Sequence, residues 1–132
     1  MLERRAPDDP REWVNRARSD LEIAGSRKEG VYLEDLCFHA QQAAEKAVKA
    51  LLIKHNVEFP YVHDIAQLLT LLEKTGQQIS EPIRQAERLT RFAVIARYPG
   101  MAPPTTLDEY NEALSLAENL VRWAEDQLRR PV

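Results

Sequence analysis

The sequence is poor in residues that would cross-link the chain or anchor it in a membrane. It has one cysteine among 132 residues, so no internal disulfide can form and no CxxC zinc or redox motif exists. Its longest fully apolar runs, such as residues 92–96, are far too short to cross a bilayer. The N-terminal stretch MLERRAPDDP lacks the apolar core of a secretory signal. These absences predict a protein of the cytoplasm with no membrane segment.

Alternating apolar and polar residues, the pattern of a half-buried strand, are also missing. Apolar residues instead recur at helical spacing, and most of the four glycines and eight prolines fall between the periodic segments. No internal repeat is present, and the length suits one core. We therefore expect an all-α protein with one domain over residues 1–132 and a core of about 10–129. Short connections favour an antiparallel up-and-down bundle of four to five helices.

Caps and helix breakers predict where each helix begins and ends. Asp9 with Glu12, and Thr106 with Glu109, have the spacing of capping boxes, and Ser80 is a third expected N-cap. The expected helices cover about residues 10–24, 33–55, 64–75, 81–98 and 106–129.

The segment CFHAQQAAEKAVKALL, residues 37–52, carries polar side chains on the second expected helix. At about 100° per residue its alanines form a core stripe. On roughly the opposite side lies a polar row at steps of three and four, made of His39, Gln42, Lys46 and Lys49. This polar row is either a solvated helix face or a contact surface for another subunit or an anion, because His and Lys can donate to phosphate.

Arginines dominate the fourth expected helix. Arg84, Arg88 and Arg91 share one face, which is either paired with carboxylates of a neighbouring helix or a basic patch for phosphate or an acidic partner. Arg97 falls on the opposite side of the wheel. We expect its guanidinium to point toward the protein and to be held by a carboxylate, backbone carbonyls or an anion. The adjacent Tyr98 would fix the exit of the helix.

Few residues suggest covalent or metal chemistry. Cys37 borders the core stripe and is interpreted as a small buried hydrophobe. His63 and Asp64 precede the third helix and are interpreted mainly as a loop anchor and a helix cap. No set of His, Asp or Glu has convincing metal-ligand spacing, so no metal or other cofactor is expected.

Three segments together resemble the HEPN domain (higher eukaryotes and prokaryotes nucleotide-binding). They are CFHAQQAAEKAVKALL, HDIAQLL and RYPG, in this order, and the similarity covers about residues 13–127. The resemblance implies a small stand-alone prokaryotic bundle of four to five helices, commonly a homodimer. It also implies that the gene often stands beside one for a minimal nucleotidyltransferase, as a toxin–antitoxin-like pair.

The sequence departs from the wider superfamily at one point that matters for catalysis. The resemblance links the chain to a superfamily in which many members are metal-independent ribonucleases. Their signature is an arginine followed, after four to six residues, by a histidine. After Arg97 those places hold Ala102, Pro103 and Pro104, and all three histidines precede the fourth expected helix. The usual proton-transfer group is therefore missing. Of the two residues in this signature, the resemblance implies a role only for the arginine, Arg97, as a phosphate ligand.

Three functions remain open from the sequence. The first is a non-catalytic, dimeric binding module that contacts a nucleotidyltransferase partner, a nucleotide, or both. The second is a ribonuclease with a variant site built from His39 and Arg97. The third is a purely structural homodimer. The net charge of −3 argues against a protein that coats nucleic acid, although RNA stays open as a ligand. The missing histidine and the polar row favour the first.

Overall fold

The chain folds into a bundle of helices in the computed structural model, which describes residues 3–131. Every regular element in that range is helical, which confirms the expected all-α class. The elements are α1 (Pro10–Ala24), α2 (Leu33–Lys54), α3 (Ile65–Glu73), α4 (Glu81–Arg84), the 3-10 helix η1 (Gln85–Leu89), α5 (Phe92–Ile95) and α6 (Leu107–Arg129). None of the helices in residues 3–131 is long and apolar enough to cross a membrane.

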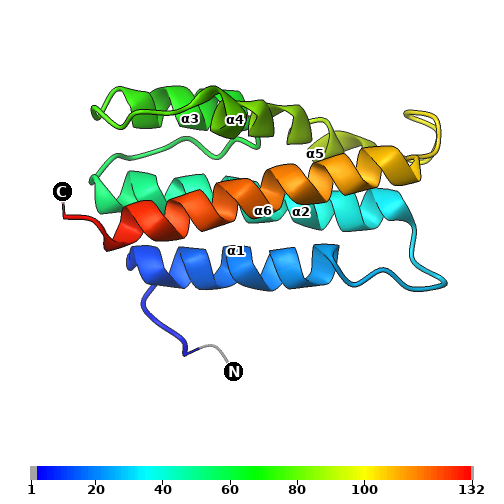
Figure 1. Ribbon diagram of the computed structural model, residues 1–132, viewed down its shortest axis with the longest axis horizontal. Coiled ribbons are helices and arrows are strands. Elements are labelled where there is room, and N and C mark those ends of the chain that lie inside the picture. Colours follow the sequence, from blue (N-terminus) through cyan, green and yellow to red (C-terminus); the bar gives the residue numbers. More distant parts are fainter. Residues whose placement is uncertain (1–2, 132) are drawn as a thin grey trace.

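Three long helices pack together, and the short ones lie over α2 and α6, on the side away from α1 (Figure 1). The chain runs one way in α1, back in α2, forward through α4, η1 and α5, and back again in α6. As a result α2 and α6 run in the same direction. Hydrogen bonds tie their ends: Thr105 N–H donates to Glu34 where both begin, and Lys54 Nζ donates to the Gln127 carbonyl where both end.

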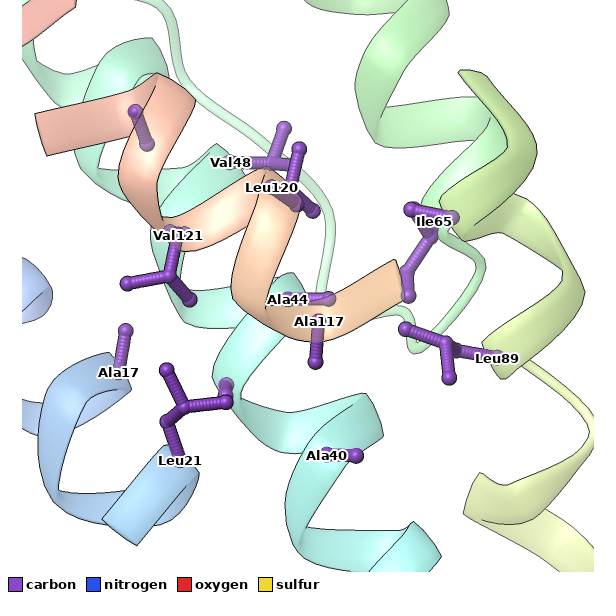
Figure 2. Close-up of a cluster of buried hydrophobic side chains, with 14 of the residues drawn as sticks. Ala17, Leu21, Ala40, Ala44, Val48, Ile65, Leu89, Ala117, Leu120 and Val121 are labelled. Atoms are coloured by element: carbon purple, nitrogen blue, oxygen red, sulfur yellow. The ribbon is translucent and has the colours of Figure 1, made fainter. Parts of the chain in front are cut away.

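Helix α2 lies at the centre of the core, and its main neighbours are α1 and α6. Small side chains on its buried face let those two helices approach closely. The expected core stripe is confirmed by six fully or almost fully buried residues: Leu36, Ala40, Ala43, Ala44, Ala47 and Leu51. Figure 2 shows Ala40 and Ala44 in one cluster with Leu21 of α1 and Ala117 of α6.

The predicted caps hold at α6 and in part at α1. Thr106 Oγ1 accepts a hydrogen bond from Glu109 N–H at 3.1 Å, and the Glu109 carboxylate accepts from Thr106 N–H at 2.9 Å. Asp9 caps α1 as expected. The box predicted there is wrong, because the Glu12 carboxylate accepts from Arg5 N–H at 2.8 Å and does not close onto Asp9. The N-terminal segment thus competes with the cap for this carboxylate.

The single fourth helix expected over residues 81–98 is wrong, since α4, η1 and α5 are three short pieces. Ser80 occupies the N-cap of α4 but makes no side-chain capping bond. At the junction of η1 and α5, backbone bonds span three residues, as from Ala93 N–H to the Thr90 carbonyl at 3.0 Å. The Thr90 hydroxyl also accepts from Ile65 N–H at 3.1 Å. This contact with the start of α3 favours a bend over a continuous helical ladder.

Candidate functional site

Asp20 of α1 is a buried carboxylate that lies between two members of the polar row. One of its oxygens is 3.0 Å from His39 Nδ1, and the other accepts from Lys46 Nζ at 2.5 Å. Its side chain is 10% exposed, against 33% for His39 and 26% for Lys46. The polar row therefore lies against α1 at these two positions. The helical wheel had placed it on the side turned away from the bundle, and this placement is wrong for His39 and Lys46.

Lys49 lies even further from its expected position. It is 7% exposed, and its Nζ donates to Glu45 at 2.9 Å. The ring centroids of Phe59 and Trp13 are 5.2 Å and 6.0 Å from that ammonium group. Two aromatic rings and a carboxylate therefore enclose the charge. The placement of Lys49 on an accessible row is thus corrected: it belongs to the interior.

Glu45 is the centre of this second cluster. Besides Lys49, it accepts from Gln41 Nε2 at 2.9 Å and lies 2.8 Å from His63 Nδ1. Burial alone would raise the pKa of Glu45, but the hydrogen bonds from Lys49, Gln41 and His63 outweigh it and leave that pKa below its ordinary value. The cluster holds the loop between α2 and α3 onto α2. This confirms His63 as a loop anchor, and Asp64 caps α3 as expected.

A shallow cleft of about 380 Å³ separates the first turns of α2 from the segment after α5. We call it the His39–Arg97 cleft, and its lining consists of Asp35, Phe38, His39, Ala96 and Arg97. The rings of Phe38 and His39 meet edge to face, with centroids 5.6 Å apart. Asp20 engages His39 Nδ1, and within residues 3–131 the other ring nitrogen, Nε2, makes no side-chain hydrogen bond. The cleft thus combines a guanidinium, an imidazole and an aromatic ring with one carboxylate.

Arg97 departs from its expected setting. Helix α5 ends at Ile95, so Arg97 lies beyond it and is exposed. None of the ion pairs or side-chain hydrogen bonds within residues 3–131 involves its guanidinium. The expectation of an inward, held arginine is wrong because the continuous helix on which it rested is absent. Tyr98 is also exposed and does not line the cleft.

The other arginines of this region are paired. Arg84 binds Glu73 of α3 at 2.6 Å, Arg88 binds Glu112 of α6 at 2.7 Å, and Arg91 lies 3.5 Å from Glu109 of α6. The alternative in which carboxylates of neighbouring helices pair with this face is confirmed. Little free positive charge is left there for the basic patch that was also considered.

A larger cleft of about 1120 Å³ lies at the opposite end of the bundle, around Trp123 and His55. Its main charged groups are already engaged: Lys54 with backbone carbonyls of the α6 terminus, and Arg130 with Asp126. It therefore offers a ligand little unpaired charge, in contrast to the His39–Arg97 cleft.

Covalent and metal chemistry find little support in the described part of the chain. Cys37 is fully buried, as expected, and burial raises the pKa of its thiol to about 12, so the reactive thiolate is suppressed. Across residues 3–131 there is no group of three or more His, Cys, Asp or Glu side chains that could hold a metal ion.

The sequence interpretation missed Asp20, Gln41 and Glu45. A signal for each was present. Asp20 stands within the apolar stripe of α1, between Ala17 and Leu21, where a charge needs a partner. From Gln41 to Glu45 to Lys49 the step is four, the spacing of helical ion pairs. The polar side of α2 is thus two faces, one toward Asp20 and one toward the α2–α3 loop.

The structure is a small bundle of packed helices with a polar cleft beside its central helix. The chain belongs to the HEPN domain family, whose model matches residues 10–127. It is 32% identical to TT1696 from Thermus thermophilus, with a TM-score of 0.78 over 90% of this chain and 98% of that one.

Two further proteins are similar to this chain. ST0689, described as an archaeal HEPN homologue, is 29% identical, with a TM-score of 0.72 over 97% of this chain and all of that one. A protein of Methanocaldococcus jannaschii named "Putative toxin MJ1304" is 26% identical over 131 residues, which cover 89% of this chain and 86% of the relative.

Proposed function

We propose that this chain is a non-catalytic, toxin-like HEPN binding protein that receives a phosphate-bearing ligand, a nucleotide, in the His39–Arg97 cleft. It works as a homodimer beside a nucleotidyltransferase partner. In this scheme His39 contacts the ligand, while Lys46 binds Asp20 across the α1–α2 interface and Gln42 donates to Gln41 within α2.

The observation that carries the proposal is the free guanidinium of Arg97. In a chain with more acids than bases, the neighbouring Arg84, Arg88 and Arg91 each have a carboxylate partner. Arg97 has none within residues 3–131 and faces the same cleft as His39 and Phe38. A planar guanidinium binds phosphate bidentately, and an aromatic ring suits a nucleobase.

The toxin-like relative supports a partner protein for this chain. A minimal nucleotidyltransferase is the partner that the HEPN resemblance implies, and we propose it here. Sedimentation of the pure protein should give the mass of a dimer. Co-expression with an adjacent nucleotidyltransferase, if the genome encodes one there, should yield a complex that survives size-exclusion chromatography.

Calorimetric titration with ATP and GTP tests ligand binding directly. We expect binding by the native chain and at least a roughly tenfold weaker Kd in Arg97→Ala, because a charge-assisted bidentate contact is lost. Arg130→Ala is the matched control, since Arg130 lies at the opposite end of the bundle and pairs with Asp126. No heat with any nucleotide, or equal affinity in both variants, would overturn the proposal.

Ribonuclease activity is the second candidate, because one cleft contains both His39 and Arg97 and Asp20 holds the imidazole. A histidine oriented in this way can transfer a proton while an arginine binds the phosphate. Pure protein incubated with single-stranded RNA would then cleave it, and His39→Ala would abolish the cleavage. His55→Ala, in the distant larger cleft, is the control. Intact RNA after long incubation excludes this second function.

A further inference from the structure

We propose that Asp20 is a positioning residue that fixes the imidazole of His39, so that its Nε2 is presented to the His39–Arg97 cleft. This inference rests on the proposed ligand site there and adds to it the buried group on α1 that sets the chemistry of His39. Asp20 itself lines a separate cleft, together with Arg16 and Lys46, and touches no ligand in this scheme.

The first argument is the direction of the hydrogen bond. An ionised carboxylate can only accept, so His39 Nδ1, 3.0 Å from Asp20, must carry the hydrogen. The neutral ring then has its lone pair on Nε2. The protonated ring has a second N–H there, which can donate to a phosphate oxygen. A buried carboxylate behind an imidazole fixes both the tautomer and the ring orientation.

The second argument is the sharing of one carboxylate by two cations. Lys46 Nζ donates to Asp20 at 2.5 Å and partly neutralises the charge that would otherwise act on His39 alone. The charged groups near the imidazole are therefore Asp20 of α1, Lys46 and Asp35 of α2, and Arg97 after α5. The ammonium group of Lys46 thereby holds the Asp20 carboxylate in place beside the imidazole.

Three substitutions separate positioning from mere packing. Asp20→Ala removes the acceptor of Nδ1–H, whereas Asp20→Asn keeps an oxygen that can accept it but removes the charge. Lys46→Met keeps Asp20 and removes its second partner. A purely structural role for Asp20 would let these substitutions change stability without changing the tautomer of His39 or the affinity of the cleft for a ligand.

Nitrogen-15 NMR of the full chain, labelled at histidine, reads the tautomer of His39 without any ligand. We expect the native chain and Asp20→Asn to show the Nδ1–H form at high pH. Asp20→Ala should show a large share of the Nε2–H form. An unchanged tautomer in Asp20→Ala overturns the proposal. If that variant does not fold, the decision rests on the ligand affinities of Asp20→Asn and Lys46→Met.

The ligand readout uses ATP, a nucleotide of the proposed kind, at one fixed pH. Affinity should be at least roughly threefold weaker in Asp20→Asn, because the charged carboxylate behind the imidazole is lost, and should change less in Lys46→Met, which keeps that carboxylate. Equal affinity in the native chain and Asp20→Asn overturns the positioning role. Absence of binding by the native chain would overturn the ligand site instead, and the tautomer experiment would still decide on Asp20.

Discussion

At the scale of single residues, the buried ion pair of Glu45 and Lys49 is the contact whose loss should cost most. Glu45→Ala would leave the Lys49 ammonium, 7% exposed, without its carboxylate. Uncompensated buried charges of this kind destabilise by about 3–5 kcal/mol. The free energy of unfolding in urea measures the loss. The double variant Glu45→Ala, Lys49→Met should lose clearly less than the sum of the two single variants, because no charge is stranded. Additive losses would mean that the two side chains act independently.

The Glu45 carboxylate should also determine part of the dependence of stability on pH in the acidic range. Hydrogen bonds hold the folded pKa of Glu45 below its ordinary value of 4.5. A carboxyl group with a lowered folded pKa stabilises the fold fully above its unfolded pKa, and the contribution is lost as the pH falls through the folded value. Glu45→Gln should therefore be less stable than the native chain at about pH 7, and the gap should narrow below about pH 4. Urea unfolding at stepped pH measures this gap. A gap of constant size from about pH 7 to about pH 3 would contradict the ionised state of Glu45.

At the scale of elements, the N-terminal caps of α6 and α4 offer a matched comparison. Thr106 and Glu109 exchange two hydrogen bonds, whereas Ser80 makes no side-chain capping bond. Thr106→Ala should cost about 1 kcal/mol of unfolding free energy. Ser80→Ala should change it by a few tenths at most, since no capping bond is lost. Thermal unfolding of the two variants tests this difference. Equal losses would show that capping does not explain the stability of α6.

The elements that could be predicted from the sequence are those with local signals at both ends. Helix α2 was expected over residues 33–55 and spans Leu33–Lys54, because its apolar period is continuous. The break between α4 and α5 could not be found in this way. It depends on a tertiary contact, from Ile65 N–H to the Thr90 hydroxyl, across 25 residues of sequence. Long-range contacts of this kind override local propensity.

The candidate site shows the same limit. His39 and Arg97 were both singled out from the sequence, yet the prediction placed Arg97 facing inward. An exposed position after a short α5 brings it to the cleft with His39. A helical wheel for α2 also cannot say which neighbour each face meets. Asp20 on α1 binds His39 on one face of α2, and His63 in the loop before α3 binds Glu45 on another. These contacts divide the one expected polar row into two clusters.

At the scale of the whole molecule, stability should be distributed unevenly between the long helices and the short ones. Helix α2 is surrounded by α1, α6 and the α3–α5 layer (Figure 1), and most of its residues are buried. Residues 96–104, in contrast, are half-buried or exposed and contain no helix. Segments with few buried contacts open locally, at a free energy well below that of global unfolding.

Native-state hydrogen exchange should therefore divide the chain. Amides in the middle of α2 and α6 should exchange only through global unfolding, with the steepest dependence on urea. Amides of residues 96–104 should exchange through local opening that hardly depends on urea. Because Arg97 lies in this segment and His39 lies on α2, the His39–Arg97 cleft joins the most rigid part of the molecule to one of the most easily opened. A bound nucleotide should accordingly slow exchange in residues 96–104 far more than in α2. Equal protection of the two segments without ligand would contradict this division.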